Sequence, residues 1–596
     1  METTSTSILK GGEFLLREAD PESVFCPEDF NEEQIMLRKS VRDFLNREVE
    51  SRHELFDGPE GRELAPGLLE QMGQLGFLGI GVPEEYGGFE ANFVTQLAFG
   101  EIAYASWAFG LSIGVQTSLG VAPLLLYGNA DQKARYLPGI VSAEIKSCYC
   151  LTEPGAGSDA NSGKTRAAYN DDQSHFILNG QKMWITSSGH ADLFFVFAKI
   201  EDDKNLSCFI VEKGYGGIRL GAEEKKMGIK GSSTRQVFFE NVKVPVENLL
   251  GERQQGFKIA LNVLNTGRIK MATSVTGTSK RALDYGVNYA IERVQFGRPI
   301  AQFGAIQHKI GEMVARIYAM ESLAYRTGGH IDRMLDEMVG GGMDPLDAKF
   351  RSIAEFATEC AMAKVFNTEG EDFVVDESLQ MHGGMGYSAE TPIETMYRNA
   401  RIDRIYEGTN EINRMLTVDM LLRRALKGQL DLMSRGMAVM QDFQAGKVVQ
   451  KPASTSFADQ CLTGIANLKR AALLVAMSAS QKLMQQLEEE QEVLMHVADM
   501  LMQIYAAESA VLRTLKQSGG EDYELRQAIS RLVLYRAAEV CQDAGQEALL
   551  GFAEGGELEA LLDAVEQLTR VGHFNTKQLR RQVAEAAIAR KGYPMG

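Results

Sequence analysis

Three short segments of the chain hold residue types that could carry acid–base or redox chemistry. The first is YCLTEPGAGSD, from Tyr149 to Asp159. Its glycines permit a ligand to approach the backbone closely. Exposed backbone N–H groups, together with the Thr152 and Ser158 hydroxyls, could bind a pyrophosphate. The same residues are also compatible with a tight loop that has no ligand.

The second segment is KMWIT, from Lys182 to Thr186, which contains one of the two tryptophans of the chain. Trp184 and Thr186 lie two positions apart, so on a β-strand their side chains point to the same face. This arrangement suits stacking of the indole on a planar ring while the Thr186 hydroxyl bonds the edge of that ring. A half-buried core tryptophan is the alternative that the pattern allows.

The third segment runs from Arg404 to Ile412 and places one carboxylate among apolar residues. Glu407 lies between an apolar run and a glycine, just before a helix that Thr409 or Asn410 can cap. Apolar surroundings disfavour the charged form of a carboxylate and raise its pKa toward the working pH. A general base for a weakly acidic C–H group needs this property. An exposed glutamate at a helix start is the alternative.

The N-terminal part of the chain is predicted to be helical. Asn31 and Gln34 form a capping-box pattern, after which apolar residues recur at helical spacing. A second helix is predicted from Pro66 to Leu75. Apolar helical stretches follow at 93–127 and 131–141.

Near Lys146 the pattern changes to short segments rich in Val, Ile and Phe, which favour β-strands. Strands are predicted at 193–200, 206–211 and 236–244. Asn179 and Gly180 lie between two apolar runs and predict a β-hairpin, because Asn-Gly accepts the positive φ of a type I′ turn. The middle block is therefore predicted to be a small antiparallel β domain.

Helical patterning returns at Gly256 and continues to about residue 428, including a long segment from Ala354 to Met381. A linker at 445–457 precedes four predicted helical segments with breaks near Glu490, Gly519 and Gly555, enough for a bundle. The predicted fold class is mainly α, with a central antiparallel β domain and an extra C-terminal helical domain. The predicted boundaries are 1–145, 146–252, 253–428 and 429–596.

Composition excludes several classes of function. The 596 residues include 62 Lys and Arg against 80 Asp and Glu, a net charge of −18, which argues against nucleic acid or anionic membrane as the main partner. Cys148 and Cys150 are too close for a zinc pair, and His308 with Glu312 has no third ligand nearby, so no metal site is predicted. The N-terminus lacks the pattern of a signal or transit peptide, and no apolar run reaches membrane-spanning length, so a cytoplasmic protein is expected.

Six motifs, taken together and in order, resemble the acyl-CoA dehydrogenase family over about residues 30–425. They are YCLTEPGAGSD, KMWIT, KKMGIKGSST from Lys225, ERVQFGRPI from Glu292, QMHGGMGY from Gln380 and YEGTNEI from Tyr406. The resemblance implies a helical, then β-barrel-like, then helical fold and a non-covalently bound FAD.

The resemblance also implies a role for each matching residue. Glu407 would remove the α-proton of an acyl-CoA thioester while a hydride passes to the flavin, because Gly267 occupies the place where some members carry the base. Ser158, Asn265, Arg268 and Gly408 would contact substrate. The residues implied to contact FAD are Tyr149, Leu151, Thr152, Gly157, Ser158, Trp184, Ile185, Thr186, Thr409 and Asn410, with Arg293, Phe296, Gln380 and Gly384 meeting the FAD of a partner subunit. By their types alone, Arg293 and Gln380 are ordinary helix-surface residues.

Two departures from the usual pattern resemble the very-long-chain branch of the family: Phe303-Gly304 in place of Phe-Gln, and about 170 extra C-terminal residues. This implies long-chain fatty acyl-CoA substrates in β-oxidation, a homodimer, an electron-transferring flavoprotein as acceptor and a bacterial cytoplasmic location. The branch also implies peripheral membrane contact through 433–450, for which core packing or disorder is the alternative. An assembly or scaffold protein and an acyl-CoA oxidase are the alternative functions.

Overall fold

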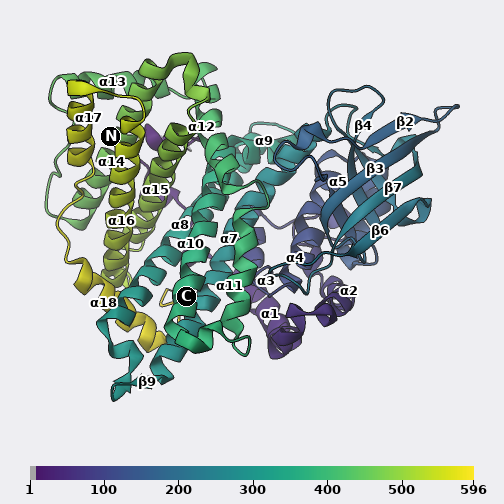
Figure 1. The fold of residues 1–596 in the computed structure, drawn as a ribbon, viewed down its shortest axis with the longest axis horizontal. Helices are drawn as coiled ribbons and strands as arrows, with labels where there is room; N and C mark the ends of the chain where they lie inside the picture. The colour runs from purple at the N-terminus through teal and green to yellow at the C-terminus, as the bar shows by residue number, and fades with distance from the viewer. Residues whose placement is uncertain (1–8, 596) are drawn as a thin grey trace.

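A computed structural model describes residues 9–595 of the chain. Helices make up most of it, and one β-sheet stands to the side of the helical body (Figure 1). The predicted capping box begins α1, because Asn31 Oδ1 accepts from Gln34 N at 2.9 Å while Gln34 Oε1 accepts from Asn31 N at 3.0 Å. The first helices are α1 (Glu32–Glu48), α2 (Pro59–Gln74), α3 (Phe93–Ala103), α4 (Phe109–Gly114), α5 (Ala122–Tyr127) and α6 (Ala130–Ser142).

Two predictions in this part need correction. The helix predicted from Pro66 begins earlier, because Pro59 takes the first helical position, where its missing N–H costs nothing. The apolar stretch 93–127 is not one helix but three, with a π-helical turn from Val115 to Leu119 between α4 and α5. Such turns inside α-helical runs are frequent at functional sites.

The β domain contains β1 (Ser147–Cys150), β2 (Arg166–Tyr169), β3 (His175–Thr186), β4 (Leu193–Ile200), β5 (Ser207–Glu212), β6 (Ile218–Glu223), β7 (Thr234–Pro245) and β8 (Leu249–Leu250). Their order is β6-β7-β3-β2-β4-β5-β8, with β1 beside β4. The sheet is mixed rather than antiparallel, because β1 and β2 both pair with β4 in parallel. Those pairs are separated by crossover connections, which short-range sequence patterns do not reveal.

The hairpin predicted at Asn179-Gly180 is wrong. Both residues lie inside the continuous strand β3, where the pairing with β7 shifts between Leu178 and Gly180. Gly180 has φ +154°, and a Cβ at this position would lie 2.5 Å from Thr165 Oγ1. The glycine therefore serves a bulge and a close packing contact, not a turn.

The central helical part begins at Gly256, as predicted, with α7 (Gly256–Glu292), the short hairpin β9 (Val294–Gln295) and β10 (Arg298–Pro299), and α8 (Gly304–Gly340). It continues with α9 (Pro345–Glu355), α10 (Ala357–His382), α11 (Pro392–Ala400) and α12 (Asn410–Leu426). The predicted long segment 354–381 is interrupted at Phe356, between α9 and α10.

The C-terminal extension contains α13 (Leu432–Gln444), α14 (Phe457–Leu483), α15 (Gln491–Lys516), α16 (Tyr523–Leu550), α17 (Gly555–Leu568) and α18 (Thr576–Arg590). Beyond the coil at 445–456 there are thus five helices in the described chain, not the predicted four. The missed break lies between α17 and α18, where Asn575 Oδ1 accepts from Gln578 N at 3.2 Å and caps the last helix.

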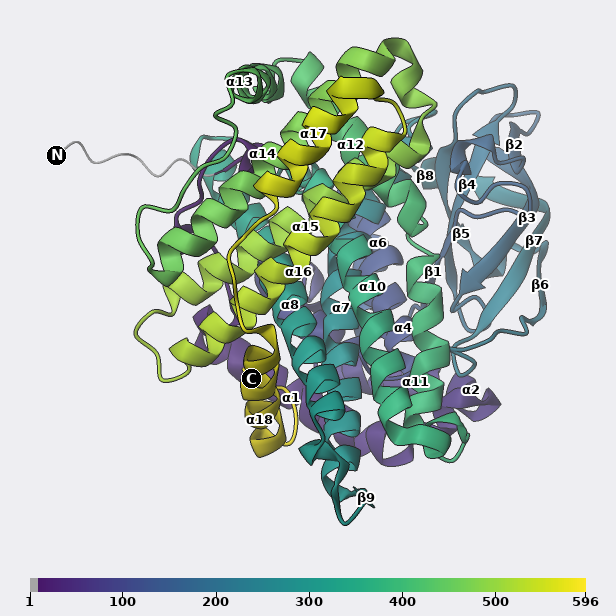
Figure 2. The same cartoon turned by 60° about the vertical axis from the view of Figure 1, so that its left-hand side comes forward.

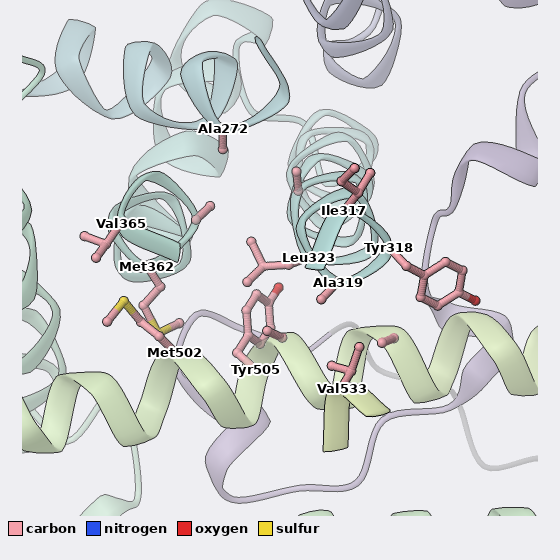
Figure 3. Packing of buried hydrophobic residues seen from close by; sticks show 14 of the residues in the cluster. Ala272, Ile317, Tyr318, Ala319, Leu323, Met362, Val365, Met502, Tyr505 and Val533 are labelled. Carbon is pink, nitrogen blue, oxygen red and sulfur yellow. The ribbon is translucent and has the colours of Figure 1, made fainter. Parts of the chain in front are cut away.

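The extension and the central helices share one hydrophobic core. Tyr505 and Met502 of α15 lie against Leu323 of α8 and Met362 of α10 (Figure 3). In the turned view, α15 and α16 run beside α8 (Figure 2). Burial of large apolar side chains across this boundary ties the extension to the body of the protein.

Two helical stretches, Phe109–Tyr127 and Phe457–Glu488, have the length and hydropathy of membrane spans. In the apolar 18-residue segment of each, however, 83% and 72% of the residues are buried inside the protein. This is the pattern of core helices. All seven cysteines are buried free thiols.

Candidate active site

Glu407 lies in a strained turn between α11 and α12. Its φ is +58° and that of Gly408 is +83°, so two successive residues adopt the left-handed conformation. A non-glycine residue in this region costs free energy and is often found at functional sites. Thr409 follows as the N-cap of α12, because its Oγ1 accepts from Ile412 N at 3.3 Å.

The Glu407 carboxylate points into a cavity. Its Oε2 atom is buried and has no hydrogen-bond partner among the described residues. A Cβ on Gly267 would lie only 2.7 Å from that oxygen, so the glycine on α7 provides the space that the carboxylate occupies. Burial raises the pKa of Glu407 to about 7, although the charges of Arg268 and Lys364 act in the opposite direction.

Side chains from three helices hold the backbone around Glu407. Arg268 donates through Nε to Glu407 O at 3.3 Å and through Nη1 to Asn265 Oδ1 at 2.7 Å. Lys364 donates to Gly408 O at 2.9 Å. These cations contact carbonyl oxygens rather than the Glu407 carboxylate, which therefore keeps its basicity.

Two further residues complete this support. Asn410 Oδ1 accepts from Lys364 Nζ at 2.7 Å, and Asn413 Nδ2 donates to Gly408 O at 2.8 Å. Both asparagines are buried. Asn410, predicted to contact the flavin, therefore fixes the turn from within the protein.

The cavity beyond Glu407 follows one face of α7. It is lined there by Gly267, Met271, Ser274, Thr278 and Arg281, which recur every three or four positions. At a rise of 1.5 Å per residue, the fourteen positions from Gly267 to Arg281 span about 21 Å. Opposite walls come from Gly110 and Gly114 of α4, Met396 of α11 and Thr186 of β3.

Residues in and around this cavity fit a flavin. Thr186 lines the cavity, and the buried Tyr149 hydroxyl has no hydrogen-bond partner among the described residues. Burial raises the pKa of the Tyr149 hydroxyl well above its usual range, and the charges of Cys208 and Glu407 add to the rise. In the glycine-rich loop, Cβ atoms on Gly155 and Gly157 would meet no atom within 4 Å, which leaves room for a pyrophosphate.

A buried ion pair holds this loop to the sheet. Lys182 Nζ lies 2.7 Å from Glu153 Oε1 and donates to Leu151 O at 3.1 Å. Met183 N donates to Thr152 O at 2.9 Å. Leu151 and Thr152 are thus fixed by the strand that carries Thr186, whereas Gly157 and Ser158 lie on the exposed part of the loop.

Trp184 and Thr186 do not lie on a regular strand face, contrary to the prediction. The register between β3 and β7 shifts between Lys182 and Ile185, and Trp184 has φ +61°. Trp184 is 52% exposed, Ile185 is buried and Thr186 lines the cavity. The core-tryptophan alternative is also wrong, because the indole lies at the surface.

Four predicted residues lie away from the cavity. Arg293 and Phe296 are exposed at the end of α7 and in the β9–β10 hairpin, which projects from the helical body (Figure 2). Phe296 is 94% exposed. Gln380 and Gly384 are exposed at the end of α10 and in the turn after it. Their role toward a partner subunit stays a prediction.

Several titratable residues in the cavity lining were missed by sequence reasoning, among them Glu371, Asp403 and Lys270. Burial lowers the pKa of Lys270 to about 7. The only sequence signal is a charged residue on a helix face that is otherwise apolar, and this signal is weak. Within residues 9–595, no group of three or more His, Cys, Asp or Glu is placed to hold a metal ion.

Comparison with known proteins places the chain in a family. The N-terminal, middle and C-terminal domain models of acyl-CoA dehydrogenase match residues 31–144, 148–242 and 254–422, and a further model of an acyl-CoA dehydrogenase C-terminal domain matches 467–567. The chain therefore belongs to the acyl-CoA dehydrogenase family.

Individual relatives agree. A probable acyl-CoA dehydrogenase from Bacillus subtilis is 39% identical over the full length of both chains. The human very long-chain specific acyl-CoA dehydrogenase is 37% identical over 68% of this chain and 59% of its own length. A crystal structure of a Bacillus anthracis acyl-CoA dehydrogenase complexed with FAD has a TM-score of 0.93 and 39% identity, covering 98% of this chain and 100% of its own. These findings confirm the predicted family and fold class, and they support FAD as the cofactor.

Proposed function

We propose that this protein is an FAD-dependent dehydrogenase that converts long-chain fatty acyl-CoA to trans-2-enoyl-CoA, with Glu407 as the base. One observation carries the proposal: the Glu407 carboxyl is buried, unpaired and aimed into a cavity, in a space that only a glycine at position 267 leaves open. A carboxylate with a purely structural role does not need open space beside it of the kind that Gly267 provides.

The residues of the chain perform the proton transfer. Glu407 takes the α-proton of the thioester, and its pKa of about 7 makes it a much stronger base than an exposed glutamate. The left-handed turn exposes backbone N–H groups, and the Glu407 N–H would donate to the thioester oxygen as negative charge develops there. Arg268 and Lys364 hold this turn in place through its carbonyl oxygens.

FAD, when bound, supplies the acceptor for the hydride that leaves the β-carbon. The residues that would hold it are Thr186 and Tyr149 beside the ring system and the loop from Thr152 to Ser158 beside the pyrophosphate. Support comes from the orphaned Tyr149 hydroxyl and from the open space around Gly155 and Gly157. Asn265 and Arg268, bonded to each other, would lie beside the CoA portion.

The length of the cavity supports a long acyl chain. Its lining continues along α7 for about 21 Å from the position of the base, far more than a short acyl group needs. Gly114 lines it without a side chain. A side chain at Gly114 meets only ordinary contact with Tyr104, so Gly114→Leu should fill the cavity and shift activity from hexadecanoyl-CoA toward octanoyl-CoA.

Anaerobic addition of palmitoyl-CoA to the FAD-loaded protein tests the proposal. We expect the visible absorbance of the flavin to be lost, and a series from butyryl- to stearoyl-CoA with an artificial electron acceptor should favour the long chains. An unchanged flavin spectrum with every chain length would favour an assembly or scaffold protein instead. Rapid peroxide formation in air would favour an oxidase.

We further propose a cytoplasmic homodimer that passes electrons to an electron-transferring flavoprotein, with the four domains divided as predicted. Phe296 in the β9–β10 hairpin and Tyr387 in the turn after α10 are exposed, which supports an interface between two copies. Peripheral membrane contact through 433–450 is a separate proposal, supported by Met433 and Met437, which α13 exposes while it buries Val439. Sedimentation and vesicle flotation test these two points separately.

A further inference from the structure

The lining of the cavity that starts at Glu407 changes from apolar to acidic toward its distal part. Its middle is lined by apolar residues such as Met271 and Val275, but Glu371 of α10 and Asp403, in the turn before Glu407, also line it. Thr278 of α7, which also lines the cavity, lies beside Glu371. Thr278 lies eleven positions beyond Gly267, which corresponds to about 16 Å along the helix.

Glu371 is a buried polar group with an unmet hydrogen-bonding need. Its side chain is 1% exposed, and its Oε2 atom has no N–H or O–H donor among the described residues. Asp403 lies within hydrogen-bond reach of Glu371, and Tyr406 donates its hydroxyl to Asp403 Oδ1. Burial raises the pKa of both carboxyls.

The cations nearby are already engaged. Arg281, at the end of the cavity, lies 3.1 Å from Glu50, and Arg404 lies 3.1 Å from Asp372. Lys364 acts on Asp403 only at a distance, and its own donors go to Gly408 and Asn410. The carboxyl pair therefore faces the cavity as a hydrogen-bond acceptor without a cation beside it.

An alkyl chain without hydroxyl groups cannot satisfy the hydrogen-bonding groups of the Glu371–Asp403 pair. It would exclude water from the pair and offer no hydrogen-bond donor in return, which leaves a buried acceptor unsatisfied. A hydroxyl group on the distal part of the chain would donate to the acceptor while the rest of the chain packs against the apolar middle. Sites with buried hydrogen-bonding groups discriminate strongly against analogues that lack the partner group.

We propose that the acyl cavity selects acyl-CoA substrates whose chain carries a hydroxyl group in its distal part, which donates to the Glu371–Asp403 pair. This inference rests on the proposed dehydrogenase function and specifies its substrate class. Glu371 thereby becomes a specificity-determining residue, while the chemistry at Glu407 is unchanged.

The test compares kcat/KM for hexadecanoyl-CoA with that for 12-hydroxy- and 16-hydroxyhexadecanoyl-CoA, using an artificial electron acceptor and the FAD-loaded enzyme. We expect the wild-type enzyme to favour at least one hydroxylated chain by about tenfold, the scale of one hydrogen bond. Glu371→Met, which keeps the length of the side chain but removes the acceptor, should abolish or reverse the preference.

Two further variants make the result specific. Glu371→Gln can donate to Asp403 and still accept from the substrate, so it should keep the preference for the hydroxylated chain. Glu377→Met removes a glutamate from the same helix that pairs with Lys309 outside the cavity, and should also leave the preference unchanged. Flavin content and anaerobic reduction by hexadecanoyl-CoA report whether each variant is folded and active.

Equal or higher kcat/KM for hexadecanoyl-CoA than for both hydroxylated chains would overturn the inference, as would a preference that survives in Glu371→Met. In either case flavin reduction by hexadecanoyl-CoA would leave the dehydrogenase function intact. Absence of flavin reduction with all three chains would instead contradict the proposed function itself.

Discussion

Two groups of buried carboxyls differ sharply in their surroundings. Where the extension meets the central helices, Arg513 lies 2.8 Å from Glu28 Oε1 and 2.7 Å from Glu321 Oε2, and its side chain is 1% exposed. Nearby, Arg326 lies 2.9 Å from Glu508. In the cavity beside α7, by contrast, no cation lies within ion-pair distance of the Glu407 carboxylate in the described chain.

The pKa values follow this difference. The adjacent guanidinium groups hold the pKa of Glu28 well below its usual range, even though burial acts to raise it. Burial without a paired cation raises the pKa of Glu407 to about 7. Burial is therefore common to both sites, and the position of the nearest cation decides whether the pKa of the carboxyl is lowered or raised.

Removal of the base should have the largest effect. Glu407→Gln keeps the size and hydrogen-bonding capacity of the side chain but cannot accept a proton, so we expect kcat to fall by about 10²- to 10⁴-fold. Binding of FAD and acyl-CoA should change little, as measured by flavin absorbance and by titration. Glu411→Gln, in the first turn of α12, is the matched control, and a near-normal rate in Glu407→Gln would show that the base lies elsewhere.

Removal of Arg513, which pairs with Glu28 and Glu321, should instead lower the stability of the folded protein. Arg513→Met leaves Glu28 and Glu321 without their shared guanidinium, and loss of one partner from a buried ion pair typically costs about 3–5 kcal/mol. Urea denaturation measures the change in the free energy of unfolding. Arg536→Met, which removes an exposed pair with Glu539, should cost less than about 1 kcal/mol. Equal losses in the two variants would contradict the structural role of Arg513.

Filling the space beside the base should have a smaller effect. A methyl group in Gly267→Ala would lie 2.7 Å from Glu407 Oε2 and must displace the carboxylate. We expect kcat to fall by roughly 10- to 100-fold, because a small misplacement of a reacting group is costly. Gly340→Ala, whose Cβ would meet no atom within 4 Å, is the control. Unchanged turnover in Gly267→Ala would mean that catalysis does not need the open space beside the Glu407 carboxylate.

Local patterns predicted the regular elements well. The capping box of α1 and the bounds of β4, Leu193–Ile200, agree with the structure, because both depend on neighbouring residues. Gly180 was misread because its requirement comes from Thr165, which reaches it only in the folded sheet. Parallel pairing of β1 and β2 with β4 was missed for the same reason.

The same limit applies to the site. Apolar neighbours and a following helix start were enough to single out Glu407. Glu371 and Asp403 come from different elements and meet only across the cavity, so no local motif marks them. The positions of Arg293 and Gln380 agree with an exposed surface, but their predicted contact with a partner subunit remains to be tested.

The pH dependence of kcat/KM tests the central claim about Glu407 most directly. Its raised pKa means that the carboxyl holds a proton below pH 7 and cannot accept another, so the rate should rise with pH through about 7 and then level off. The residual activity of Glu407→Gln should lack this rise. A midpoint near 4.5, the ordinary value for glutamate, or the same rise in the variant would contradict the claim that a buried, unpaired Glu407 is the base.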